Sequence, residues 1–297
     1  MELQERSEEL QASGLNVVAI SYDSEEVLSA FATRRGITYP LLSDDDSAAI
    51  TAFGILNTVA AEAIGPNAAD PAVVADAEKY VSVFGASPMI VGTPFPGTFI
   101  VDANGRVTSR FFEEFYRERN TTSSIMLRLG TDMNPVSGVK GETPHLTIAA
   151  SQSNPDVTVG TKFSLVLDIE PHPGIHVYAP GAEELGYRVI GLGITAGADD
   201  AVLRAEPLAY AASEIYHFEP LDEHVPVYQK PFRLIQDVVI EAHPGVEDAL
   251  ADRDVITLSG QLDYQACDDS LCFDPVSVPL SWTVAVTQLD RQRAERD

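Results

Sequence analysis

The sequence is poor in cysteine and in positive charge, and it has no long apolar run. Among 297 residues there are two cysteines, Cys267 and Cys272, so any thiol chemistry must take place at this pair. The 19 lysines and arginines are outnumbered by 45 aspartates and glutamates, which gives a net charge of −26. Such a surface repels phosphate groups and excludes nucleic acid as an expected partner. No stretch approaches the ~18 consecutive apolar residues of a membrane span.

Other common signals are also missing. The N-terminal segment MELQERSEELQASG has no basic region, apolar core or small-residue cleavage site of an export signal. Two cysteines without a nearby histidine pair fall short of the four ligands of a structural zinc site. There is no phosphate-binding glycine loop and no Ser/His/Asp set, so we expect neither a metal nor a cofactor. What is present is a 45% hydrophobic composition, which supports packed cores, and a length that favours two domains.

Residues 1–133 alternate between strand and helix patterns, which predicts an α/β domain. The run LNVVAISY, residues 15–22, is typical of a strand buried on both faces. Ser24 before two glutamates predicts a helix N-cap, and DANG at 102–105 predicts a hairpin with a primed turn. The expected helices span about 3–10, 24–36, 46–53, 71–84 and 121–129, and the further strands span 39–42, 98–101 and 107–112.

The segments ELQERSEEL, GLNVVAISYDS, YPLLSD and PFPGTFIVDANGRV carry a family resemblance. Residues 2–130 resemble the thioredoxin-like peroxiredoxin family (AhpC/TSA, redoxin). The resemblance implies that Pro96 is a cis-proline that lines an active site. In that family the reactive cysteine begins the helix whose later turns resemble residues 2–12, and this sequence has no counterpart of that cysteine or of the strand before it.

We therefore interpret this part as an incomplete thioredoxin-like α/β domain. Our preferred explanation is an incomplete open reading frame, and a decayed binding domain is the alternative. Covalent peroxide chemistry needs a thiolate nucleophile. Because no cysteine precedes Cys267, we expect no peroxidase activity from this chain.

The texture changes after residues 134–144 (NPVSGVKGETP), which we interpret as a linker. Residues 145–288 contain short β-type runs separated by turn residues, which predicts a β-sandwich without helices between its strands. Residues 289–297 form a charged tail. The expected strands span 145–150, 162–169, 187–193, 232–242, 255–264 and 276–286.

Cys267 and Cys272 flank four residues between two β-type runs, which predicts a hairpin with a four-residue loop. Facing residues at its neck lie roughly 4.5–5.5 Å apart, within the range that a disulfide needs. A ring this short contributes only ~2 kcal/mol of stability, so a structural and a redox-active pair both remain open. Asp268 and Asp269 should hold the thiol pKa at or above ~8.5, which suits a disulfide attacked by a partner's thiolate.

The segments GIHVYAPG, VPVYQKPFRL and YQACDDSLCFDP, with the trailing VPLSW, carry a second resemblance. Residues 143–286 resemble the N-terminal domain of the thiol:disulfide interchange protein of the DsbD type, an immunoglobulin-like β-sandwich. The resemblance implies that Cys272 forms a mixed disulfide with a partner and that Cys267 resolves it. The implied partners are thioredoxin-like domains or disulfide-bearing proteins.

Accessory residues follow from the same resemblance. Residues 217–224 correspond to a cap loop, with Phe218 or Leu221 as the covering side chain, although a plain acidic loop is an alternative. Tyr178 and Tyr264 correspond to active-site walls, although core packing explains them too. His172 and His176 are expected to end strands, and Trp282 to lie in the core.

The leading functional expectation is a thiol:disulfide oxidoreductase that relays electrons through Cys267 and Cys272. One alternative is a non-catalytic binding or scaffold protein with a structural disulfide, and another is a fragment of a peroxiredoxin-type antioxidant enzyme. Because disulfides persist outside the cytosol, we expect a periplasmic or membrane-tethered intact protein. If Met1 is the true start, we expect a cytoplasmic protein.

Overall fold

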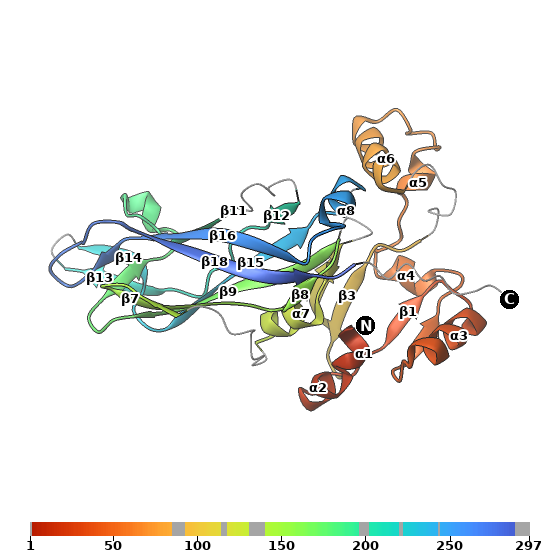
Figure 1. Cartoon of the computed structure of the whole chain (residues 1–297), viewed down its shortest axis with the longest axis horizontal. Helices are drawn as coiled ribbons and strands as arrows, with labels where there is room; N and C mark the ends of the chain where they lie inside the picture. The colour runs from red at the N-terminus through yellow and green to blue at the C-terminus, as the bar shows by residue number, and fades with distance from the viewer. Residues whose placement is uncertain are drawn as a thin grey trace. The chain divides into compact units, whose positions relative to one another are not determined.

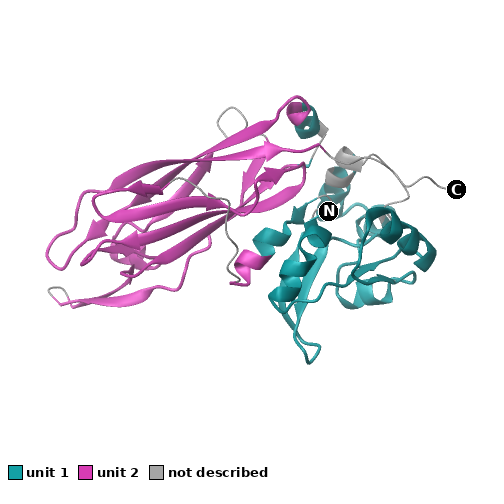
Figure 2. Cartoon of the chain, turned by 60° about the horizontal axis from the view of Figure 1, so that its bottom comes forward, with its two compact units in different colours: residues 1–125, 242–248, 289–297 teal, residues 126–241, 249–288 magenta. Residues whose placement is uncertain are grey.

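The computed structural model describes most of the chain, namely residues 2–84, 93–113, 118–130, 140–195, 202–219, 222–242 and 244–288. The chain divides into two compact units (Figure 2). Unit 1 comprises residues 1–125, 242–248 and 289–297, and unit 2 comprises residues 126–241 and 249–288. Within the described ranges, no helix is long and apolar enough to cross a membrane.

The predicted linker and tail are only partly visible. Residues 134–139 and 289–297 lie outside the described residues. Residues Lys140–Glu142, at the C-terminal end of the predicted linker, form strand β6, which pairs with β7 (Leu146–Gln152) at the edge of a sheet. The clustered Pro, Gly and Ser residues predicted a linker because glycine weakens a strand. Gly141 nevertheless lies in a short strand at the edge of the sheet.

Unit 1 alternates between helices and short strands, as predicted. Ser24 caps α3 by accepting a hydrogen bond from the backbone N–H of Val27 (3.5 Å), and Gly36 ends this helix in the left-handed conformation. The predicted first helix is interrupted at Arg6. The elements before residue 126 are α1 (Glu2–Glu5), α2 (Ser7–Ala12), β1 (Ala19–Ser21), α3 (Glu25–Arg35), β2 (Leu41–Ser43), α4 (Ala48–Ala52), α5 (Val59–Glu62), α6 (Pro71–Phe84), β3 (Gly97–Val101), β4 (Val107–Phe112), β5 (Arg119–Asn120) and the start of α7 (Thr122–Arg128).

The strand predicted at residues 15–22 is shorter and more exposed than its composition indicates. Strand β1 covers Ala19–Ser21 and pairs in parallel with β2 in a two-stranded sheet. Val18 is 52% exposed and Ile20 is 43% exposed. A buried parallel strand needs neighbours on both edges and cover on both faces. In the part of the chain that the structure describes, β1 has one strand neighbour, so the prediction of a doubly buried strand is wrong.

The hairpin of β3 and β4 is confirmed, but its turn differs from the prediction. The backbone N–H of Gly105 donates to the carbonyl of Asp102 (3.0 Å), which defines a turn over residues 102–105. Gly105 has a φ of +78°, whereas Asn104 is not among the described non-glycine residues with positive φ. A primed turn needs positive φ at a central residue. The turn is therefore unprimed, with Gly105 in the left-handed conformation after it.

Unit 2 is built mainly of strands (Figure 1). The strands predicted at 255–264 and 276–286 are confirmed residue for residue. Helices η2 (Ala182–Leu185) and α8 (Pro244–Leu250) lie between strands, which the sequence pattern did not indicate because each is too short to show a helical period. The strands after β7 are β8 (Asp156–Val157), β9 (Thr161–Pro171), β10 (His176–Tyr178), β11 (Gly191–Thr195), β12 (Leu203–Ala205), β13 (Glu214–Phe218), β14 (Glu223–Tyr228), β15 (Phe232–Ile240), β16 (Val255–Tyr264), β17 (Ala266–Cys267) and β18 (Val276–Val286).

These strands form three sheets, in the orders β12-β15-β9-β7-β6, β11-β16-β18-β8 and β13-β14-β10-β17. The first two share a core. Trp282 on β18 is 3% exposed, and its indole N–H donates to the carbonyl of Ser151 on β7 (2.9 Å), which confirms its predicted core position. The third sheet is small and holds Cys267 at one edge, opposite the hairpin of β13 and β14.

Candidate active site at the cysteine hairpin

Cys267 and Cys272 form a disulfide across the neck of a hairpin, with a Cα–Cα distance of 4.1 Å. The two residues form an antiparallel bridge, and beyond it the N–H of Asp268 donates to the carbonyl of Leu271 (2.9 Å). The predicted hairpin with a four-residue loop is therefore present. The loop brings the two sulfur atoms together at the neck of the hairpin.

The two sulfurs differ in accessibility. Cys267 is 2% exposed and belongs to an apolar cluster with Val225 and Val227 of β14, whereas Cys272 is exposed. Leu271, beside Cys272, is 59% exposed. An attacking thiolate must approach a sulfur along the S–S bond, so access selects the sulfur that is attacked. Here Cys272 is open to attack and Cys267 is the buried leaving group.

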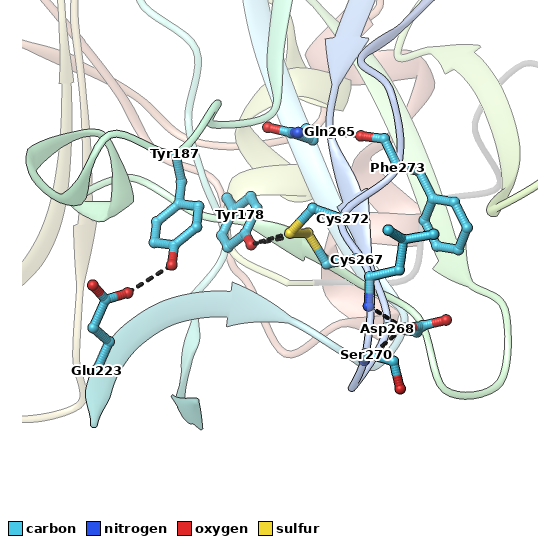
Figure 3. Close-up of a disulfide and its surroundings, with 10 residues drawn as sticks. Tyr178, Tyr187, Glu223, Gln265, Cys267, Asp268, Ser270, Cys272 and Phe273 are labelled. Atoms are coloured by element: carbon cyan, nitrogen blue, oxygen red, sulfur yellow. Dashed lines mark hydrogen bonds between the residues drawn. A yellow bond between two sulfur atoms is a disulfide. The ribbon is translucent and has the colours of Figure 1, made fainter. Parts of the chain in front are cut away.

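Tyr178 supplies a hydroxyl to both sulfurs. Its Oη lies 2.9 Å from Cys267 Sγ and 3.3 Å from Cys272 Sγ (Figure 3). A disulfide sulfur carries no hydrogen, so the tyrosine O–H is the donor in both contacts. Burial, followed by the nearby Tyr187, Glu223 and Tyr216, raises the pKa of Tyr178 well above its usual range. The hydroxyl therefore keeps its proton at physiological pH.

Tyr187 holds Tyr178 in place. The two rings stack with centroids 4.3 Å apart, and the Tyr187 hydroxyl donates to Glu223 Oε2 on β14 (2.6 Å), as Figure 3 shows. This hydrogen bond, together with burial and the charge of Glu223, raises the pKa of Tyr187 to about 12. The Tyr187 hydroxyl therefore donates to a carboxylate, whereas the Tyr178 hydroxyl donates to the sulfurs.

The loop between the cysteines is acidic and ordered by its own backbone. Asp268 Oδ1 accepts the N–H groups of Ser270 and Leu271, both at 2.7 Å, and these bonds lower the pKa of Asp268. Asp269 Oδ1 accepts the hydroxyl of Tyr216 on β13 (2.9 Å). The hydrogen bond between Asp269 and Tyr216 joins the cysteine loop to the β13–β14 hairpin.

His176 is the first residue of β10, so it lies at the end of a strand, as predicted. It pairs directly with Cys267 on β17 and is 4% exposed. Its ring stacks at a tilt on Tyr216, with centroids 4.7 Å apart. Burial lowers the pKa of His176, although the charges of Asp269 and Asp268 oppose this shift.

The predicted accessory residues have mixed outcomes. Tyr178 lies against the pair, as expected. Tyr264 does not, because the chain changes sheet at Gln265, and the Tyr264 hydroxyl donates instead to Thr143 Oγ1 (2.8 Å). The β13–β14 hairpin occupies the position of the expected cap, but Tyr216 rather than Phe218 reaches the cysteine loop. Leu221 lies outside the described residues.

Pro96 lies just before β3 in unit 1. None of the described peptide bonds is cis, so the bond before Pro96 is trans and the expectation of a cis-proline is wrong. Its carbonyl accepts the N–H of Glu113 (3.2 Å), which anchors the start of the hairpin. In the described ranges no three potential ligands gather into a candidate metal site.

Sequence inspection did not single out Tyr187, Tyr216 or His176 for the site. The only signal available was the alternation in residues 176–178, which places His176 and Tyr178 on one face of a strand. Tyr187 and Tyr216 lie in separate segments that join the site through hydrogen bonds to Glu223 and Asp269.

Comparison with known proteins gives a family match to the first part of the chain. The model of the AhpC/TSA family matches residues 1–110. A putative peroxiredoxin of Mycobacterium tuberculosis (strain CDC 1551 / Oshkosh) is 52% identical over 42 residues, which are 14% of this chain and 27% of that protein. A putative peroxiredoxin of strain ATCC 25618 / H37Rv matches equally. The chain thus spans about a quarter of the length of the curated relatives that it matches.

Two solved structures are similar at low scores. The N-terminal periplasmic domain of ScsB from Proteus mirabilis has a TM-score of 0.33 and 15% identity, covering 50% of this chain and 51% of that one. The reduced N-terminal domain of DsbD from Neisseria meningitidis has a TM-score of 0.27 and 13% identity, covering 41% and 81%. The first part of the chain therefore resembles the AhpC/TSA family.

Proposed function

We propose that this protein carries out thiol–disulfide exchange at Cys267 and Cys272. The observation that carries the proposal is the asymmetry of the pair, with an exposed Cys272 bonded to a buried Cys267 whose sulfur faces the Tyr178 hydroxyl. A purely structural disulfide needs neither an open sulfur nor a donor aimed at the buried one. The similarity to AhpC/TSA proteins supports the same class of chemistry.

Reduction of the disulfide would proceed in two balanced steps. A partner thiolate attacks Cys272 Sγ, so a mixed disulfide forms, the Cys267–Cys272 bond breaks, and Cys267 leaves as a thiolate that accepts the Tyr178 hydrogen bond. A second thiol of the partner then loses its proton and attacks the partner sulfur that is bonded to Cys272. The partner's own disulfide forms, and Cys272 is released as a thiolate. Two electrons pass from the partner to this protein, which can return them to a disulfide substrate.

We further propose that the partners are thioredoxin-like domains or disulfide-bearing proteins, that unit 2 is an immunoglobulin-like sandwich, and that the protein works outside the cytosol. Two face-to-face sheets support the sandwich. Persistence of disulfides in oxidising compartments supports the location. Unit 1 contributes no thiol, because the sequence has no cysteine before Cys267.

Trapping of the mixed disulfide tests the proposed exchange. We expect Cys267→Ser to accumulate a covalent complex between Cys272 and a thioredoxin-like protein whose second active-site cysteine is replaced by serine and whose first carries a nitrobenzoate disulfide. The complex is seen on non-reducing gels, because neither protein then keeps a resolving thiol. Cys272→Ser is the matched control and should trap none, because Cys267 is buried. Redox titration of the unchanged protein adds a second criterion, since a potential below about −300 mV marks an inert structural bond and would refute the proposal.

A further inference from the structure

His176 is a buried titratable group beside the cysteine pair, and the exchange described above does not use it. It lies directly opposite Cys267 in the pairing of β10 with β17. Opposed residues of an antiparallel pair point to the same face, with Cβ atoms roughly 4.5–5.5 Å apart. Tyr178, two residues further on, shares that face and reaches Cys267 Sγ at 2.9 Å. The imidazole of His176 and the sulfur of Cys267 are therefore neighbours.

The ring of His176 has no hydrogen-bond partner in the described part of the chain, although the residue is only 4% exposed. Its contacts are with aromatic rings, at centroid distances of 4.7 Å to Tyr216 and 5.7 Å to Tyr178. Because no hydrogen bond commits the imidazole to another side chain, it is available to exchange a proton with the neighbouring pair.

The charges around His176 favour its protonation when a proton becomes available. Asp268 and Asp269 face it from the cysteine loop, Tyr216 faces it from β13, and Tyr178 lies on its own strand. In the oxidised protein burial outweighs the two carboxylates and lowers the pKa of His176. The ring is thus a neutral base at pH 7, with two carboxylates placed to stabilise its cation.

Cys267 needs such a base when the reduced pair is reoxidised. A thiol must lose its proton before it can attack a disulfide. In the reduced protein, burial and the two neighbouring carboxylates disfavour the charged thiolate of Cys267. Solvent is a poor acceptor for a thiol that is 2% exposed.

We propose that His176 accepts the proton of the Cys267 thiol during reoxidation by a disulfide substrate, an inference that rests on the proposed exchange. Cys272 is then in a mixed disulfide with the substrate. The Cys267 proton moves to the His176 imidazole, and the Cys267 thiolate attacks Cys272 Sγ. The intramolecular disulfide forms, the bond from Cys272 to the substrate breaks, and the leaving thiolate recovers the proton from the imidazolium, directly or through solvent.

The test follows the two steps separately in the reduced full-length chain. An equimolar bis(nitrobenzoate) disulfide releases one coloured thiolate when Cys272 attacks it and a second when Cys267 resolves the mixed disulfide. We expect His176→Phe to slow the second release about tenfold at neutral pH, the change in thiolate fraction that one pKa unit produces. The two proteins should converge at high pH, where solvent base removes the Cys267 proton. His172→Phe is the matched control and should leave both phases unchanged.

Equal second-phase rates and pH profiles in the variant and the unchanged protein would overturn the proposal. A slow second phase that does not recover at high pH would also overturn it, because only packing would then be lost. If the unchanged protein released no second thiolate, the proposed exchange itself would fail, and the role of His176 with it.

A measurement on the unchanged protein covers the case in which the variant does not fold. In the reduced protein, NMR of the His176 ring protons should show a second inflection at the pH where Cys267 loses its proton, because the new thiolate lies beside the imidazole. Ring signals that do not respond to the ionisation of Cys267 would contradict the proposal.

Discussion

The hydroxyl oxygen of Tyr178 lies 2.9 Å from the sulfur of Cys267, and these two residues are separated by 89 positions in the chain. The contact to the exposed Cys272 is longer, at 3.3 Å. The hydroxyl can donate its single hydrogen to one sulfur at a time. It is closer to the buried sulfur, on which negative charge develops when Cys272 is attacked.

Tyr178→Phe removes this donor and keeps the ring that packs beside the pair. We expect reduction by dithiothreitol to slow about 10- to 100-fold, because a hydrogen bond to a charged group contributes about 1.5–3 kcal/mol. Tyr228→Phe is the matched control, since the Tyr228 hydroxyl donates to the carbonyl of Ala211. Equal rates in Tyr178→Phe and the control would show that the hydroxyl does not assist the leaving group.

Asp269→Asn should make the reduced cysteines more acidic. The substitution removes a negative charge from the cysteine loop but keeps an amide oxygen that can accept the Tyr216 hydroxyl. We expect the thiol pKa to fall by up to about one unit, because the loop is exposed and salt screens the charge. The pH dependence of the alkylation rate measures this thiol pKa. Asp252→Asn, on an exposed turn after α8, is the control and should leave the thiol pKa unchanged.

Gly260→Ala should destabilise the core of unit 2. A Cβ at this position would lie 2.6 Å from Cζ3 of Trp282, and the indole is fixed by its hydrogen bond to Ser151. We expect a loss of about 1–3 kcal/mol in the free energy of unfolding, the usual cost of overpacking. Urea denaturation measures this loss. Gly193→Ala, where an added Cβ meets no atom within 4 Å, provides the control.

The stability of the oxidised protein should fall as the pH drops below about 6.5, the ordinary pKa of histidine. Burial lowers the pKa of His176 in the folded state, so the unfolded chain binds more protons in this range and unfolding becomes easier. The loss should level off once the pH passes the lowered value. His145, also lowered by burial, adds to the slope.

In His176→Phe we therefore expect a shallower dependence of the unfolding free energy on pH, measured by urea titration at several pH values. His224→Phe, at an exposed position, serves as the control. An unchanged slope in His176→Phe would mean that this histidine does not resist protonation in the folded protein.

Much of the secondary structure could be predicted because its signals are local. The helix at Pro71–Phe84 and strands β16 and β18 agree with their predicted bounds. The cap at Ser24 depends on residues three positions apart. The exposure of Ile20 could not be predicted, because an apolar run reports the residues of a strand and not how many strands flank it.

The pairing of Cys267 with Cys272 and the acidity of their loop were readable from the chain, because five positions separate the cysteines and the loop residues lie between them. Which sulfur is buried and which hydroxyl faces it depend on strand pairing. β10, β14 and β17 are distant in sequence but adjacent in one sheet. That sheet brings Tyr178 and His176 to Cys267, and the change of sheet at Gln265 separates Tyr264 from it. Local spacing specifies neighbours along a strand, whereas contacts across strands depend on the register that the folded core selects.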